Sequence, residues 1–249
     1  MRDPPAKVKT QFRDKIIVVT GASSGIGRET ARLFAEHGAH AIAASRRSSP
    51  PCDITRDDDV ARLFADIGQR FGRLDILVNN AGIGIRAPVA ETRPVDARQL
   101  MDVNFFGALR CAKAALPLLK KSPAAQIVNI GSILSVLATP RNSLYCASKF
   151  ALRAWNDALR IELRDAGIEV ISILPGYTDT DFFENQVRSY GSVRLHKMTG
   201  QHPRQVAAAI LRACAGHKRE VALTIPGRFG LWVKKLAPGL LDWTLEKAP

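Results

Sequence analysis

The chain has 249 residues, a formal net charge of +13, four cysteines and an apolar content that is ordinary for a globular protein. This composition excludes wholesale disorder, and no apolar run is long enough to predict a membrane-spanning helix. Lysines and arginines are spread along the chain without a long basic block. That pattern argues against nucleic-acid binding, while phosphate-bearing ligands and anionic surfaces stay open. The cysteines have no paired spacing and the N-terminus lacks the apolar stretch of a signal peptide, so we expect a cytoplasmic protein with reduced thiols and no metal site.

Apolar stretches of strand length alternate with helical patterns. KIIVVT (15–20) is a nearly continuous apolar run, which is typical of a buried parallel strand. The next residues repeat apolar side chains at helical spacing as far as Gly38, a residue that suits a helix end. Further strands are expected over 40–45, 74–79, 126–132, 169–175 and 220–226, and helices over 57–72, about 94–120, about 143–165 and about 203–216.

This alternation predicts an α/β fold. We expect one Rossmann-type domain over residues 1–249, with about seven strands in a doubly wound parallel sheet and helices on both faces. A ligand of such a fold binds beyond the carboxyl ends of the strands, at the point where the strand order reverses.

A glycine-rich turn, VVTGASSGIG (18–27), joins the first strand to the first helix. Gly21, Gly25 and Gly27 permit a tight turn and a close approach of backbone to a ligand. The helix N-terminus offers free N–H groups, and Ser23 and Ser24 add hydroxyl donors. The turn therefore predicts a phosphate or pyrophosphate site. A connection without a ligand is the alternative, and a P-loop is disfavoured because no Lys-Ser/Thr pair follows.

Five short motifs occur in one order: TGASSGIG (20–27), NNAG (79–82), VN (103–104), YCASK (145–149) and PGYTDT (175–180). In these motifs the sequence resembles the short-chain dehydrogenase/reductase family over roughly residues 14–226. The resemblance implies an oxidoreductase with a nicotinamide cofactor. It also implies a substrate lid over 177–202, in which Phe182, Phe183, Tyr190, Leu195 and Met198 would line an apolar pocket or pack the lid onto the body.

The end of the second strand predicts which nicotinamide cofactor binds. An acidic residue there would bind the ribose of NAD, whereas arginine accommodates the 2′-phosphate of NADP. Here the acid position is Ser45, followed by Arg46 and Arg47. A guanidinium holds phosphate by charge-assisted bonds, so we expect NADP(H), with Arg46 on the phosphate and Arg47 flanking the adenine. The alternative is that both arginines are solvated surface residues.

The resemblance also implies the other cofactor contacts. Only RSSPP separates Arg46 from Cys52, so the usual helix and most of the third strand are missing, which affects the register of Asp53. The residues expected to bind the cofactor are Gly21, Ser23, Ser24, Gly25, Ile26 and Gly27 in the turn; Arg46, Arg47, Asp53 and Ile54 around the adenine; Asn80, Ala81 and Gly82 under its ribose; Tyr145 and Lys149; and Pro175, Gly176, Thr178 and Thr180 around the nicotinamide.

Tyr145 and Lys149 are four residues apart on an expected helix, so both lie on one face. A nearby ammonium lowers the pKa of a tyrosine, as acid–base catalysis needs. The resemblance adds Ser132, which would hydrogen-bond the substrate carbonyl, and Asn104, which would hold a water linked to Lys149. A serine often precedes the catalytic one in the family, but here that residue is Gly131.

These residues predict hydride transfer between NADP(H) and a carbonyl/alcohol pair, on a lipophilic small molecule, with Tyr145 as acid/base. The alternatives are a non-catalytic dinucleotide-binding redox sensor or scaffold, and dehydration or epimerisation on the same fold. Relatives are commonly oligomers, so a homo-oligomer is expected. The C-terminal extension 227–249, rich in Leu and Trp, would contact either protein or a membrane surface.

Overall fold

The structure is a computed structural model, and it describes residues 11–180, 182 and 200–224. Most of the expected lid (183–199) and the whole extension 227–249 lie outside the described residues, as do four of the expected lid and pocket residues, Phe183, Tyr190, Leu195 and Met198.

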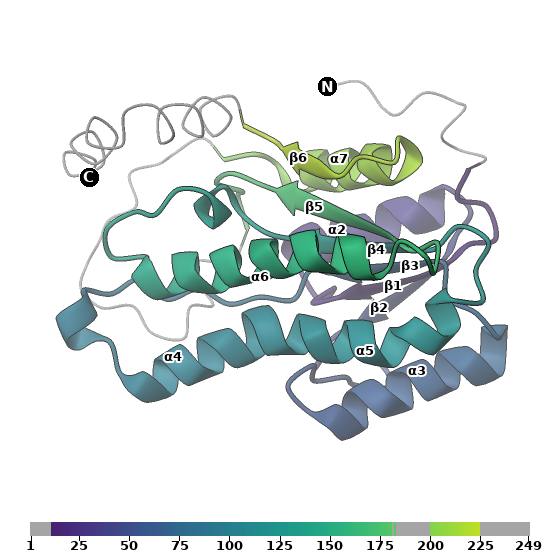
Figure 1. Ribbon diagram of the computed structural model, residues 1–249, viewed down its shortest axis with the longest axis horizontal. Helices are drawn as coiled ribbons and strands as arrows, with labels where there is room; N and C mark the ends of the chain where they lie inside the picture. The colour runs from purple at the N-terminus through teal and green to yellow at the C-terminus, as the bar shows by residue number, and fades with distance from the viewer. Residues whose placement is uncertain (1–10, 181, 183–199, 225–249) are drawn as a thin grey trace.

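The described chain forms one parallel sheet in the order β2-β1-β3-β4-β5-β6 (Figure 1). Continuous apolar stretches supply the central strands, because both of their faces are covered. The strands are β1 (Ile16–Thr20), β2 (His40–Ala44), β3 (Ile76–Asn79), β4 (Gln126–Ile130), β5 (Glu169–Leu174) and β6 (Glu220–Ala222).

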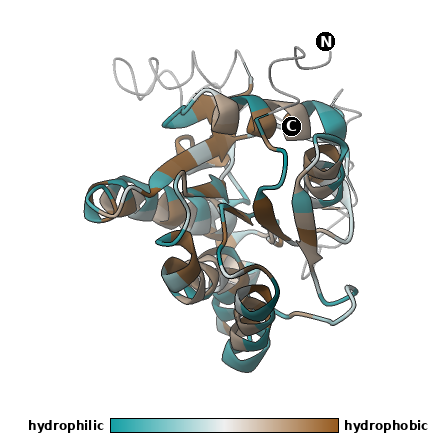
Figure 2. Ribbon diagram, turned by 90° about the vertical axis from the view of Figure 1, so that its right-hand side faces the viewer, coloured by the Kyte–Doolittle hydropathy of each residue, from teal (hydrophilic) through white to brown (hydrophobic). Residues whose placement is uncertain are grey.

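Helices cover both faces of this sheet, as expected. Ile17 and Val19 of β1 face one apolar core, and Ile16 and Val18 face the other. The first core is closed by α2 (Gly25–Glu36) and α7 (Pro203–Ala215), and the second by α3 (Asp57–Phe71), α5 (Gly107–Leu119) and α6 (Ser143–Glu162) (Figure 1). Figure 2 shows the strands largely in hydrophobic colours and the helices in mixed ones, as this layering requires.

The sheet has six strands in the described residues, where about seven were expected. The reason is the short loop after β2. Its ends are joined by a hydrogen bond in which the Cys52 N–H donates to the Ser45 carbonyl at 2.8 Å, so the chain turns back at once. It then enters α3 and crosses to β3, on the other side of β1. The strand order therefore reverses between β1 and β3, which is where a ligand is expected.

The expected helix over about 94–120 consists of three consecutive parts. A regular helix, α4 (Pro94–Met101), passes into a π-helical turn, η2 (Asp102–Phe106), and then into α5. A π turn adds one residue to a helical turn and so changes which side chains face inward. Here it contains Asn104, which is 1 % exposed. Short 3₁₀ turns lie at η1 (Val89–Glu91) and η3 (Ile133–Ser135).

A buried chain of polar side chains fixes α6 to the sheet. Asn79 of β3 donates to Asn129 of β4 at 2.8 Å, and Asn129 is hydrogen-bonded to Asn156 of α6. Asn156 in turn donates to Ser172 of β5 at 2.7 Å. Buried amides are stable only when they are paired, so the chain sets the position of α6, the helix that carries Tyr145.

Candidate active site

A cavity of about 1350 Å³ lies beyond the carboxyl ends of β1, β3, β4 and β5. It runs from Arg46 at one end to Phe182 at the other. Every residue that the sequence predicted for the site lines this cavity except Gly27 and Asn104, which lie directly behind its wall. The segments named by the five motifs therefore meet at one place.

The glycine turn needs glycine for two reasons. Gly21 and Gly25 have φ values of +64° and +54°, in the left-handed region that favours glycine. A Cβ on Gly21 would also lie 2.6 Å from the Ala81 Cα, and one on Gly27 would lie 2.4 Å from the Gly21 carbonyl oxygen. The turn thus packs directly on the NNAG segment, with no room for side chains between them.

Thr20 joins the glycine turn to the NNAG segment, a role that the sequence did not predict. Its hydroxyl accepts hydrogen bonds from the backbone N–H groups of Asn80 and Ala81, at 3.0 and 3.1 Å. The Asn80 amide donates to the carbonyls of Thr20 and Gly21 at 2.9 and 3.2 Å. The amide of Asn80 is therefore used to hold the turn in shape.

The N-terminus of α2 opens onto the cavity and fits a phosphate group. Ser23, Ser24, Gly25 and Ile26 line the cavity here, and the first turn of α2 carries no acidic residue. The positive end of the helix dipole is thus left without a carboxylate, which is the arrangement that binds anions. Together with the close packing at Gly21 and Gly27, this donor set fits the pyrophosphate of a dinucleotide.

The end of the cavity where the sequence predicts the adenine is formed by the loop after β2. Arg46 and Arg47 are exposed and line the cavity. Asp53 lines it too, but its carboxylate is engaged with Thr55, accepting from the backbone N–H at 3.0 Å and from the hydroxyl at 2.8 Å. Ile54 is buried against α5, where a Cβ on Gly107 would lie 2.4 Å from the Ile54 Cδ1.

At the other end, Ser132 and Tyr145 both line the cavity, and the Ser132 hydroxyl lies close enough to Tyr145 to lower the pKa of its phenol. Ser132 follows β4, and its backbone N–H donates to the Ser135 hydroxyl at 3.0 Å. A Cβ on Gly131 would lie 3.0 Å from this Ser135 oxygen and 2.8 Å from the Leu174 Cδ2. Glycine at 131 therefore makes room for Ser135, which holds the backbone of Ser132.

Burial governs the pKa values of the Tyr145–Lys149 pair. It raises the pKa of Tyr145 to about 12, although the hydrogen bond from Ser132 acts in the opposite direction. It also lowers the pKa of Lys149 to about 8. The Lys149 Nζ lies 5.8 Å from the centre of the Tyr145 ring and donates to the Ile130 carbonyl at 2.9 Å. The pKa of Tyr145 is thus raised and not lowered as expected, because desolvation outweighs the hydrogen bond from Ser132.

Asn104 lies behind this pair. It donates to the Ser148 hydroxyl at 3.1 Å, and Ser148 donates to the Tyr145 carbonyl at 2.8 Å. A Cβ on Gly82 would lie 3.3 Å from the Asn104 Oδ1 and 3.7 Å from the Lys149 Nζ. Asn104, Gly82 and Lys149 are therefore close together.

The segment after β5 covers the glycine turn. Pro175, Gly176, Thr178 and Thr180 all line the cavity, and a Cβ on Gly25 would lie 3.1 Å from the Thr180 Cγ2. This segment thus bridges the two ends of the cavity. The remaining wall around Tyr145 combines apolar, polar and charged side chains. The sequence predicted Phe182 among them but not Ile85, Arg86, Gln99, Ile133, Leu134, Thr139, Arg141 or Tyr177.

The described residues contain neither a cluster of metal-ligating side chains nor a membrane-spanning helix. No group of three or more histidine, cysteine, aspartate or glutamate side chains could hold a metal ion there. No helix in the described ranges has the length and hydropathy needed to cross a bilayer.

Comparisons with known proteins agree with this geometry. The family model described as short chain dehydrogenase matches residues 15–191. Dehydrogenase/reductase SDR family member 7B of Bos taurus is 35 % identical, with 94 % of this chain and 81 % of that protein covered. The 3-ketodihydrosphingosine reductase of Bacteroides thetaiotaomicron is 32 % identical, with 82 % of this chain and 85 % of that protein covered.

Solved structures share the fold. A short chain dehydrogenase from Burkholderia cenocepacia J2315 in complex with NADP has a TM-score of 0.82 and 29 % identity, covering 96 % of this chain and 99 % of that one. A structure of the same fold from Burkholderia phymatum is a complex with NAD. The fold therefore accepts either nicotinamide dinucleotide.

Proposed function

Because the chain belongs to the short-chain dehydrogenase/reductase family, we propose that it is an NADP(H)-dependent oxidoreductase that interconverts a ketone or aldehyde with an alcohol. The observation that carries the proposal is the pair of Ser132 and Tyr145 in the wall of a cavity that also contains a glycine turn fitted to an anion. A redox sensor or scaffold would need the glycine turn but not this pair.

Three groups of residues would hold the cofactor. The turn from Gly21 to Gly27 would take the pyrophosphate, and the segment from Pro175 to Thr180 the nicotinamide. Arg46 would take the adenosine 2′-phosphate, with Arg47 flanking the adenine. The choice of NADP rests on the two arginines, which lie exposed at the adenine end beside Ser45, where a carboxylate would favour NAD. When bound, the reduced cofactor supplies a hydride equivalent, which the chain's own side chains cannot do.

Ser132 and Tyr145 would hold the carbonyl oxygen of the substrate between them. The carbonyl carbon would accept the hydride that the bound cofactor supplies, and the π electron pair would move to the oxygen. Tyr145 would then give its hydroxyl proton to that oxygen, which completes the alcohol. With its pKa raised to about 12, the phenol is protonated at neutral pH, which is the form that donates, although its strength as an acid falls as its pKa rises. Lys149, with its pKa lowered to about 8, can return a proton afterwards.

The apolar part of the wall supports a lipophilic substrate. Ile133, Leu134 and Phe182 line the cavity around Tyr145, and the Phe182 ring lies 5.9 Å from the Tyr145 ring in an edge-on arrangement. Pockets for lipophilic ligands combine such walls with a few polar groups. The reductase of Bacteroides thetaiotaomicron, named for a long-chain ketone, supports the same class.

The test is NADPH oxidation by the purified full chain with a panel of neutral and charged ketones, compared with NADH. Ketone-dependent oxidation by the wild type that is lost in Tyr145→Phe supports the proposal. Cofactor binding without turnover of any carbonyl or alcohol would instead favour the redox sensor or scaffold.

Two further predictions concern assembly. We propose a homo-oligomer, and a contact of residues 227–249 with either protein or an anionic membrane surface. A chain truncated after Arg228 tests this: lost sedimentation with anionic vesicles and retained activity support lipid contact, and changed assembly or activity supports protein contact. A truncation that alters none of these would contradict both.

A further inference from the structure

Two arginines line the Tyr145 end of the cavity and lie outside the set expected to hold the cofactor: Arg86 and Arg141. Arg86 follows the NNAG segment, and Arg141 lies four residues before Tyr145. Neither forms an ion pair within the part of the chain that the structure describes.

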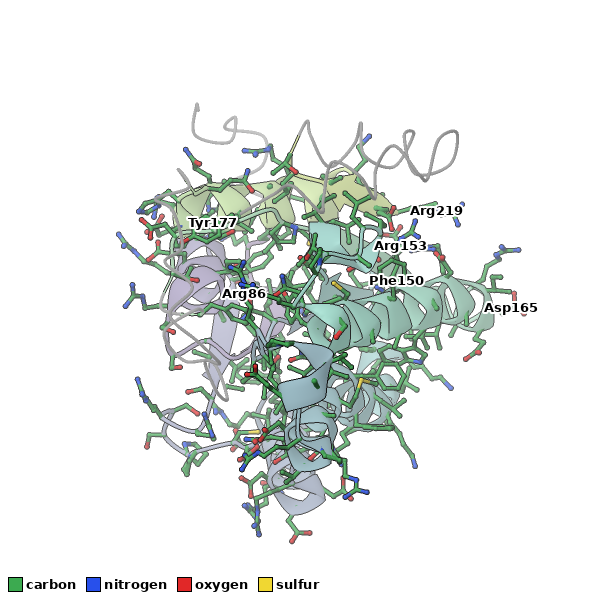
Figure 3. All side chains as sticks on the ribbon, turned by 90° about the vertical axis from the view of Figure 1, so that its left-hand side faces the viewer. Arg86, Phe150, Arg153, Asp165, Tyr177 and Arg219 are labelled. Carbon is green, nitrogen blue, oxygen red and sulfur yellow. The ribbon has the colours of Figure 1, made fainter. Side chains whose placement is uncertain are left out.

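Packing holds both residues next to the reaction centre. Ile85 and Ala87, on either side of Arg86, belong to a small apolar cluster against which Tyr145 packs. The Ala87 N–H donates to the Arg141 carbonyl at 2.8 Å, which joins the two segments. In Figure 3, Arg86 is labelled beside one end of α6, whereas Asp165, just after that helix, marks the other end.

One donor of the Arg86 guanidinium has no acceptor among the described residues. Its Nε is buried, and no described residue forms a hydrogen bond with it. A buried donor without an acceptor is destabilising, more so in a charged group, and such groups are rare unless a ligand completes them. Because the side chain lies in the cavity wall, an anionic ligand in the cavity could supply the acceptor.

The acidic residues of the cavity wall are already engaged. Asp53 accepts from Thr55 at the adenine end, and Asp102 pairs with Arg110 at 2.7 Å. No carboxylate of the described wall is thus left to neutralise Arg86 and Arg141. Among the described residues, the Tyr145 end of the cavity therefore carries a net positive charge beside apolar and neutral polar side chains.

We propose that Arg86 and Arg141 form an anion subsite, and that the substrate is an amphiphilic carbonyl compound with a carboxylate or phosphate-type group. This inference rests on the proposed oxidoreductase function. The planar guanidinium groups suit both oxyanions, because each can donate two parallel hydrogen bonds. Leu134, Ile133 and Phe182 contact the apolar part of the same molecule.

The test compares keto acids of increasing spacer length with their methyl esters, and oxoalkyl phosphonates with their dimethyl esters. KM and kcat are measured for the wild type, Arg86→Gln, Arg141→Gln and Arg86→Lys. The matched control is Arg164→Gln, the same change at an exposed arginine outside the cavity. Calorimetric titration of the acid into each protein gives a second readout that needs no turnover.

We expect the wild type to prefer at least one anion over its ester, with KM for the anion raised about tenfold or more in Arg86→Gln. KM for the ester, kcat and the NADPH dissociation constant should change little, and Arg164→Gln should match the wild type. The series in which KM rises in Arg86→Gln, carboxylate or phosphonate, identifies the kind of anion that the subsite binds.

If the ratio of KM values for acid and ester is the same in the wild type and in Arg86→Gln, the proposed subsite is wrong. A weaker NADPH affinity in Arg86→Gln would assign the arginine to the cofactor instead. If no carbonyl compound is reduced, the proposed function fails, and the calorimetric comparison still decides whether the arginines bind an anion.

Discussion

Asn104 binds both backbone polar groups of Ile83: its Oδ1 accepts from the Ile83 N–H at 2.8 Å, and its Nδ2 donates to the Ile83 carbonyl at 3.0 Å. Asn104 lies in the π turn η2, and its side chain contacts the residues that follow β3. Asn104 is therefore a positioning residue for the segment that contains Gly82 and leads to Arg86, in addition to any role in proton supply.

Changing this amide to an acid should weaken the fold. Asn104→Asp keeps the shape but replaces the donor to Ile83 and Ser148 by an acceptor, so the free energy of unfolding should fall by about 1–3 kcal/mol. Urea unfolding at pH 7 measures the change. Asn104→Ser, which is smaller but polar, should not restore stability; a fully stable aspartate variant would contradict the positioning role.

Removing the phenol should abolish turnover without loss of the cofactor. Tyr145→Phe keeps the ring but removes the proton donor, so kcat should fall by about 10² or more while NADPH affinity is retained. Single-turnover assays and fluorescence titration measure both. The matched control is Tyr177→Phe, the same change elsewhere in the cavity wall. A fully active Tyr145→Phe would mean that another group donates the proton.

Lys149 should make stability rise with pH in a defined window. Burial lowers its pKa from 10.5 to about 8, so between these values the unfolded chain binds more protons than the folded one. The free energy of unfolding should then increase with pH, by on the order of 1–2 kcal/mol from pH 7.5 to 9.5. Lys149→Met should lose this increase. Urea unfolding of both proteins at several pH values isolates the contribution of Lys149. If the free energy of unfolding changes with pH to the same extent in both, the prediction is wrong.

Arg46 should determine the cofactor preference. Arg46→Asp removes a charge-assisted bond to the 2′-phosphate and adds repulsion, which should weaken NADPH by at least roughly 1.5–3 kcal/mol and NADH much less. Titrations of both cofactors give the ratio of their affinities. Arg47→Asp is the companion variant, and a smaller effect there would support Arg46 as the main ligand. Equal wild-type affinity for both cofactors would exclude the NADP assignment.

The elements and the outline of the site could be predicted because their signals are local. The glycine turn, the Tyr145–Lys149 pair and the strand–helix alternation each occupy a short stretch of sequence. The role of Thr20 could not be predicted because its partner Asn80 is 60 residues away in the sequence. The place of Arg86 in the site could not be predicted either, because only folding brings its segment next to Arg141.

The pKa of Tyr145 could not be predicted from spacing alone. The four-residue spacing correctly puts Lys149 near the ring, but the direction of the shift depends on how much water the fold removes from both groups. Likewise, the π turn at Asn104 has no clear signature in the sequence, because its residues also fit a regular helix.

The short loop from Ser45 to Cys52 makes the edge of the sheet beside β2 a site for protein engineering. Its ends are already held together by the backbone hydrogen bond between them, so a longer segment inserted at Ser49 would start and finish at the same anchor points. An added strand could pair with the outer edge of β2 without displacing Ser132, Tyr145 or Lys149. Adenine recognition could then be redesigned as a module that is separate from the chemistry at the other end of the cavity.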